Sequence, residues 1–97
     1  MDARGAAVLD IGDDVGALVL DAPEALLGHE VELEPEGDRS RRVHTVVREQ
    51  RVGPVRRFAA VFPALRAGRY RICAGHGAGP VMVAGGAVTQ ADWPSTA

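Results

Sequence analysis

The side chains best suited to chemistry in this chain are its single cysteine and its three histidines. Cys73 and His76 stand three residues apart near the expected end of a strand, and they come closest to a catalytic cysteine–histidine pair. A reactive cysteine must ionise to the thiolate, which the neighbouring Arg71 would favour if its guanidinium lies close. We favour the simpler interpretation, a thiol on a strand edge beside a histidine in a loop.

The same residues are the candidate metal ligands: His29, His44, His76 and Cys73. A catalytic zinc site needs three protein ligands that converge from a rigid scaffold. The sequence contains no His-x-His or Cys-x-x-Cys pair, so only strands brought together by the fold could assemble such a site. His29 lies on the same side of the predicted strand as Val31 and Leu33. This favours a histidine at the strand edge that the core partly covers. We therefore expect no cofactor, with zinc or copper as the alternative.

Other familiar catalytic and binding patterns are incomplete. Neither serine lies in a Gly-x-Ser-x-Gly motif. The aspartates of residues 10–14 lack the spacing and closing glutamate of an EF-hand loop, and they suit a tight turn. The glycine-rich residues 75–79 lack the Lys-Ser/Thr of a phosphate-binding loop, and no helix is expected after them. These observations favour turns and a hairpin loop over binding sites.

Charge is distributed unevenly along the chain. All eleven basic residues are arginine, which together with the abundant Ala, Gly and Val is typical of GC-rich coding, as in actinobacteria. Residues 1–38 carry a net charge of −10 and residues 39–97 a net charge of +8, which gives −2 for the whole chain. Such polarity can steer a charged partner or a second copy. We favour acidic and basic strands lying side by side in one sheet, joined by ion pairs.

Binding of nucleic acid or of another acidic partner through the arginine-rich hairpin is a less favoured function for the basic part of the chain. Arginines suit phosphate contacts, and seven of them could form a stripe along one hairpin. These are Arg39, Arg41, Arg42, Arg48, Arg51, Arg56 and Arg57. Of the four aromatic residues, only Trp93 lies outside the expected core, which is too few to stack a single strand. The acidic part would also repel a long polyanion.

The elements that must position these residues belong to one small domain. The chain has 97 residues, of which 46% are hydrophobic and 25% charged, as in a globular protein. We expect a single β-sandwich domain over residues 1–93 and a C-terminal tail at residues 94–97. No apolar run approaches the ~18 residues of a membrane span, and the first residues lack the apolar stretch of a signal peptide. We therefore expect a cytoplasmic protein with no membrane partner.

Apolar residues alternate with period two in short runs separated by turn residues, which predicts a β-sandwich. The clearest strand is residues 29–34, where Val31 and Leu33 share one side. Glu30, Glu32 and Glu34 share the other side, which we expect to face water. A first apolar run lies at residues 6–9, and residues 24–27 suit one helical turn. The other predicted strands are residues 15–20, 43–51, 55–62, 81–84 and 87–93 and one that begins at Tyr70, about seven strands in all.

Residues 65–70, Leu-Arg-Ala-Gly-Arg-Tyr, have the spacing of a tyrosine corner. In this motif a tyrosine at the start of a strand donates a hydrogen bond from its hydroxyl to the preceding loop. Gly68 would supply the unusual backbone angle. Tyr70 and Ile72 would then point inward, with Arg69, Arg71 and Cys73 pointing outward.

Residues 60–72, 81–86 and 88–92 together resemble the C-terminal half of prealbumin-like β-sandwich modules, the carboxypeptidase regulatory-like and Cna-B-like domains. The shared pattern is F-x-x-L-x-x-G-x-Y-x-hydrophobic, then a short strand, a glycine turn and a last strand. The resemblance implies an antiparallel Greek-key sandwich of the transthyretin type, but no activity, because one fold hosts many functions. The chain also resembles short actinobacterial proteins of similar length. The hydroxyisourate hydrolase of the wider family ends in Tyr-Arg-Gly-Ser, which residues 92–97 do not match.

From these observations we predict an all-β, non-catalytic interaction module that binds a protein partner or associates with itself through an edge strand. We expect the polar contacts, within the fold or between subunits, to come from two sets of residues. They are Glu30, Glu32 and Glu34 on one strand and Arg48, Arg56 and Arg57 on the hairpin. The alternative is a small metal- or thiol-dependent enzyme that uses His44, His76 and Cys73.

Overall fold

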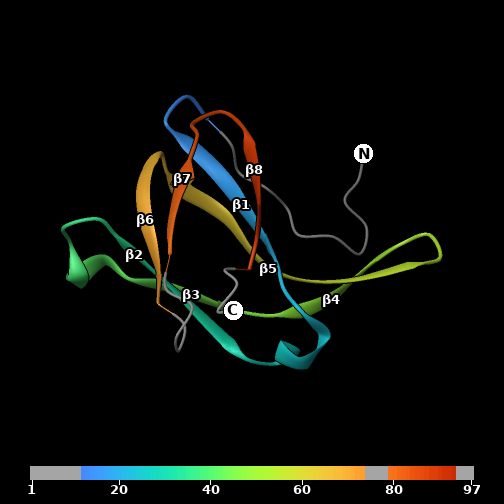
Figure 1. Ribbon diagram of the computed structural model, residues 1–97. Helices are drawn as coiled ribbons and strands as arrows, with labels where there is room; N and C mark the ends of the chain where they lie inside the picture. Colours follow the sequence, from blue (N-terminus) through green and yellow to red (C-terminus); the bar gives the residue numbers. More distant parts are fainter. Residues whose placement is uncertain (1–11, 74–78, 94–97) are drawn as a thin grey trace.

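The computed structural model describes residues 12–73 and 79–93 (Figure 1). The apolar run at residues 6–9, His76 and the tail at residues 94–97 lie outside the described residues. Within them the protein is all-β, as predicted, with eight strands in two four-stranded sheets. The described part of the chain contains no helix with the length and apolar character that crossing a membrane requires.

The first sheet has the strand order β4-β5-β1-β8. Its strands are β4 (Arg48–Val52), β5 (Val55–Arg66), β1 (Val15–Asp21) and β8 (Val88–Asp92). β1 pairs antiparallel with β5 but parallel with β8. The parallel pair departs from the antiparallel sandwich that we expected. It arises because β8 follows a strand of the other sheet, so the hairpin geometry that makes consecutive strands antiparallel does not apply.

The second sheet has the strand order β3-β2-β6-β7 and is antiparallel throughout. Its strands are β3 (Val43–Val46), β2 (Glu30–Pro35), β6 (Gly68–Cys73) and β7 (Pro80–Val83). Two single 3-10 turns precede strands of this sheet: η1 (Glu24–Leu26) before β2 and η2 (Arg39–Arg41) before β3. The helical turn predicted at residues 24–27 is therefore present as η1.

The strand predicted at residues 43–51 is in fact two strands in different sheets. β3 ends at Val46 and β4 begins at Arg48, and the residue between them, Val47, is only 1% exposed. In a single strand, the charged side chains of Glu49 and Arg51 would point to the same side as Val47, toward the core. The change of sheet at Val47 avoids this, because β4 then runs beyond the core where its charged side chains reach water.

The core lies between the two sheets and takes its residues from both. Alternate positions of β1, β2, β5 and β6 point inward, as the period-two pattern predicted. The buried cluster is Leu18, Leu20, Val31, Leu33, Val47, Ala60, Phe62, Leu65, Tyr70, Ile72 and Val83. Trp93, which we had expected to lie outside the core, packs against this cluster. All four aromatic residues therefore belong to the core or its margin.

The tyrosine corner predicted at residues 65–70 is confirmed. The Tyr70 hydroxyl donates a 2.7 Å hydrogen bond to the carbonyl oxygen of Arg66, and Gly68 has a φ of 149°. Tyr70 and Ile72 are buried, and Arg69 and Arg71 are exposed. The hydrogen bond ties the end of β5 to the start of β6 across the two sheets.

We expect Tyr70→Phe to lower the free energy of unfolding by about 1 kcal/mol at pH 7, because the buried hydroxyl and its acceptor lose their hydrogen bond. Burial raises the pKa of Tyr70 above its ordinary 10.0, and the nearby Arg66 opposes this. Because the pKa of Tyr70 is higher in the folded state, its protonated hydroxyl contributes its full stability below pH 10. This contribution is lost as the pH rises through the pKa of the folded protein. Urea unfolding at pH 7 and pH 10.5 measures both effects. If the two proteins lost stability equally between these pH values, the assigned role of the hydroxyl would be wrong.

Candidate interaction surface

The candidate catalytic and metal-ligating residues lie apart in the described structure. His44 and Cys73 point from the same outer face of the second sheet, but Glu32 pairs with His44 on one side and with Cys73 on the other. Two strand spacings, roughly 10 Å, therefore separate the histidine and the cysteine. Within residues 12–73 and 79–93, no group of three or more His, Cys, Asp or Glu side chains could hold a metal ion.

His29 and Cys73 differ in exposure. His29 is exposed, so the expectation that the core partly covers it is wrong. The reason is that β2 begins only at Glu30, and His29 follows the turn at Gly28, which has a φ of 87°. Cys73 is half-buried at the end of β6, where its thiol donates to the carbonyl oxygen of Arg71 at 3.6 Å.

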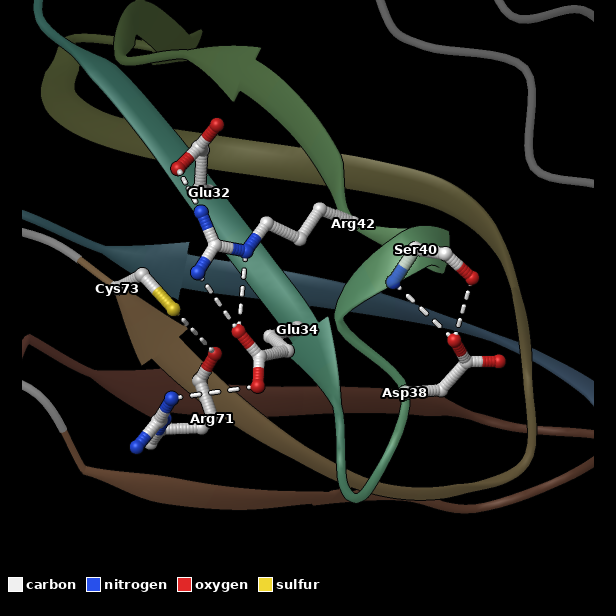
Figure 2. Close-up of polar contacts among 7 residues, drawn as sticks. All are labelled: Glu32, Glu34, Asp38, Ser40, Arg42, Arg71 and Cys73. Carbon is white, nitrogen blue, oxygen red and sulfur yellow. Dashed lines mark hydrogen bonds and ion pairs between the residues drawn. The ribbon is translucent and has the colours of Figure 1, made fainter.

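Glu34 is the most buried charged group of the described structure, and two arginines enclose it (Figure 2). One carboxylate oxygen accepts a hydrogen bond from Nε of Arg42 at 3.0 Å, and Nη2 of the same arginine lies 2.9 Å from it as an ion pair. The other accepts from Nη2 of Arg71 at 3.2 Å. The Glu34 side chain is 8% exposed. The hydrogen bond from Arg42 has the largest effect and lowers the pKa of Glu34 below its ordinary 4.5, and the positive charge of Arg71 lowers it further. Burial acts in the opposite direction.

The prediction that all three glutamates of β2 face water is therefore wrong for Glu34. It does lie on the outer side of the sheet, where Arg71 is its direct partner on β6. The long arginine side chains lie over it and exclude water. Glu30 is exposed, with its carboxylate 3.9 Å from His44, and Glu32 lies 3.6 Å from Arg42. This glutamate–arginine cluster, Glu32, Glu34, Arg42 and Arg71, is satisfied within the fold.

Arg42 and Arg71 are not among the contact residues that we predicted from the sequence. Arg71 could have been found, because it is outward-facing on a strand as Glu34 is. The missing information was that β2 and β6, with three strands between them in the sequence, are neighbours in the sheet. Arg42 lies in a loop, where alternation gives no direction for a side chain.

Arg48, Arg56 and Arg57 lie on the β4–β5 hairpin of the first sheet, which extends beyond the rest of the sandwich (Figure 1). The pairing of β1 with β5 stops at Ala59, so residues 55–58 of β5 pair only with β4. Gly53 forms the turn with a φ of 62°. Val55, next to the turn, is 52% exposed. The hairpin therefore presents both faces of its outer part to solvent.

Ion pairs hold the hairpin side chains. Glu49 accepts from Nε of Arg56 at 3.0 Å and from Nε of Arg51 at 3.2 Å. The Arg56 guanidinium also lies 5.4 Å from the centre of the Phe58 ring. Arg57 reaches Asp21 of β1 at 3.3 Å. The side chains of Arg56 and Arg57 remain 49% and 50% exposed, so both can still contact a partner.

The hairpin is the strongly basic part of this surface. Residues 48–57 hold four arginines and one glutamate. The ion pairs from Arg57 to Asp21 and from Arg56 to Glu24, at 3.3 and 4.0 Å, lie on the side of the hairpin toward the sandwich. Comparison with known protein families, curated proteins and solved structures finds no match to this chain.

Proposed function

We propose that this protein is a non-catalytic, cytoplasmic interaction module that binds an acidic surface, on a protein partner or a second copy, through its β4–β5 hairpin. The observation that carries the proposal is the extension of this hairpin beyond the sandwich with an excess of arginine. The hairpin carries four guanidinium groups and one carboxylate, and Asp21 and Glu24 offset two of the four, so a smaller positive excess attracts an acidic surface. The exposed Val55 adds apolar contact at the tip. Arginine is also suited to interfaces, because its planar donors match carboxylates.

We also propose that the sandwich is of the prealbumin-like Greek-key type. The tyrosine corner, the crossing of the chain between sheets at Val47 and the glycine turn before β8 support this proposal. Such a fold implies no activity by itself. The proposed role therefore rests on the hairpin and not on the fold type.

The test is a double variant, Arg56→Gln with Arg57→Gln. We expect at least a tenfold loss of association, measured as the fraction of complex or oligomer by native mass spectrometry at low ionic strength. The association of the wild-type protein should also weaken as salt is raised, because exposed charges are screened beyond about 10 Å at 0.1 M. Circular dichroism establishes that the variant is folded.

The matched control is Arg41→Gln with Arg69→Gln, which removes two exposed arginines from the other end of the molecule. It should leave the association unchanged. If the hairpin variant assembled as the wild type does, the proposal would be wrong. Stoichiometric zinc or copper in the same sample would instead favour the metal-dependent alternative.

A further inference from the structure

One edge of β5 has no paired strand beyond the residues that pair with β4, and we call this stretch the open edge. β4 pairs with β5 only from Val55 to Ala59, whereas β1 pairs with the other side of β5 as far as Arg66. Before Arg48 the chain turns into the second sheet, where the backbone of Val47 bonds to His29 and Gly28 at 3.0 and 2.9 Å. Beyond Ala59, β5 therefore has no paired strand on this side among the described residues.

The backbone groups that face the open edge can be identified from one hydrogen bond. The carbonyl of Phe58 accepts from the backbone N–H of Ala22 at 2.8 Å, so the backbone groups of Phe58 face the β1 side. Alternate residues of an antiparallel strand direct their groups to opposite sides. Val61 therefore faces the open side, whereas the alternation breaks around Pro63, where the register of β5 with β1 shifts between Phe62 and Leu65. Pro63 lacks an N–H, and an unpaired edge is where a strand tolerates proline.

A groove follows this edge. One hollow of about 400 Å³ is lined by Thr45, Val46, Arg48, Val61 and Pro63, among others. A second, separate hollow of about 490 Å³ is lined by the next residues of β5, among them Leu65 and Arg66, and by Val43. These volumes fall in the range of ligand-binding clefts. At this edge Val61 thus offers one N–H and one carbonyl oxygen to a chain in the groove.

The charge of the groove is positive at both ends. Its carboxylates, Glu49, Glu36 and Asp38, each lie within 4.0 Å of an arginine. Arg48 and Arg66 have no carboxylate at that distance among the described residues. Arg48 pairs with Ala59, seven positions before Arg66 on β5, which is roughly 23 Å of extended strand.

We propose that an extended acidic segment of a partner protein adds to β5 at Val61, as an extra strand between Arg48 and Arg66. Main-chain hydrogen bonds would hold it, as in other strand additions to a sheet edge. Carboxylates of the segment would pair with the two arginines. This proposal deepens the proposed function, since it names the partner as an acidic extended segment and places it beside the hairpin. It does not depend on Arg56 or Arg57.

The probe is a synthetic capped heptapeptide of alternating glutamate and valine, titrated into the ¹⁵N-labelled protein and followed by NMR. We expect saturable amide shifts at Val61 and its neighbours on β5, with slower hydrogen exchange at the Val61 amide. Arg48→Gln with Arg66→Gln should weaken binding at least tenfold. A peptide with alternate backbone nitrogens methylated, and one with lysine in place of glutamate, should each bind at least tenfold more weakly.

Three results would overturn the proposal: no shifts at millimolar peptide, shifts that map to β7 or β8, or equal affinity for the Arg48/Arg66 variant. Concentration-dependent shifts at Val61 without peptide would show that a second copy occupies the edge, and would overturn it also. The Arg56→Gln, Arg57→Gln variant should bind the probe as the wild type does. A failure of the hairpin proposal can therefore be told apart from a failure of this one.

Discussion

Gly16→Ala is expected to lower the free energy of unfolding by about 3 kcal/mol or more, a fall in Tm of roughly 12 °C or more. A methyl group at position 16 would overlap the carbonyl oxygen of Ala84 and crowd that of Ala87. These atoms belong to the turn before β8, which is held to β1 by hydrogen bonds from Ala17 to Ala87 and from Gly86 to Val15, each 3.0 Å. Since both obstacles are backbone atoms, no side-chain rotation can relieve them.

The measurement is thermal unfolding followed by circular dichroism, with Gly12→Ala as the matched control. A methyl group at position 12 meets nothing within 4 Å, and Gly12 does not have a positive φ. We expect the control to change the free energy of unfolding by less than about 1 kcal/mol. Equal Tm values for the two variants would show that the turn does not lie against β1 as described.

Glu34→Gln should lower Tm by several degrees at pH 7, and more than any other single substitution among the ionic groups of the described residues. The neutral amide leaves Arg42 and Arg71 beside each other without the carboxylate that both contact. The cost is that of the charge-assisted contacts to the buried carboxylate, since the two guanidinium groups are 38% and 58% exposed and remain partly solvated. Glu32→Gln is the control, since Glu32 is 41% exposed and lies 3.6 Å from Arg42.

The effect of Glu34 should depend on pH in a defined direction. Because its pKa is lowered in the folded state, the ionised carboxylate contributes its full stability above pH 4.5. The contribution is lost as the pH falls below 4.5 and through the lower pKa of the folded protein. The Tm values of the wild type and Glu34→Gln should therefore converge in acid. A constant difference from pH 7 to pH 3 would contradict the assigned role of the carboxylate.

The charged residues of this protein serve two roles: those of the glutamate–arginine cluster stabilise the fold, and those of the hairpin are available to a partner. The carboxylate of Glu34 is satisfied by Arg42 and Arg71 within one subunit, so we assign this cluster to stability. Arg56 and Arg57 are half exposed on an element that extends from the sandwich, so they remain accessible to a partner. Acidic and basic residues from the two parts of the sequence thus form ion pairs within the fold, and the arginines of the hairpin stay partly exposed.

The sequence by itself determined the local elements. The alternation in β2 and β5 and the spacing from Leu65 to Tyr70 each predicted a feature that the structure contains. These features depend on neighbours within a few residues. Side-chain alternation and positive φ angles follow from the chemistry of the residues themselves.

Only the tertiary structure decided which strands are neighbours. The division of residues 43–51 at Val47, the burial of Glu34 beneath Arg71 and the open edge at Val61 all follow from pairings between distant segments. Period two gives the side to which a side chain points but not the strand that lies beside it, because many pairings bury the same apolar residues equally well. The partners of Glu34 and the unpaired part of β5 are consequences of that choice, and so could not be obtained from the alternation of residues alone.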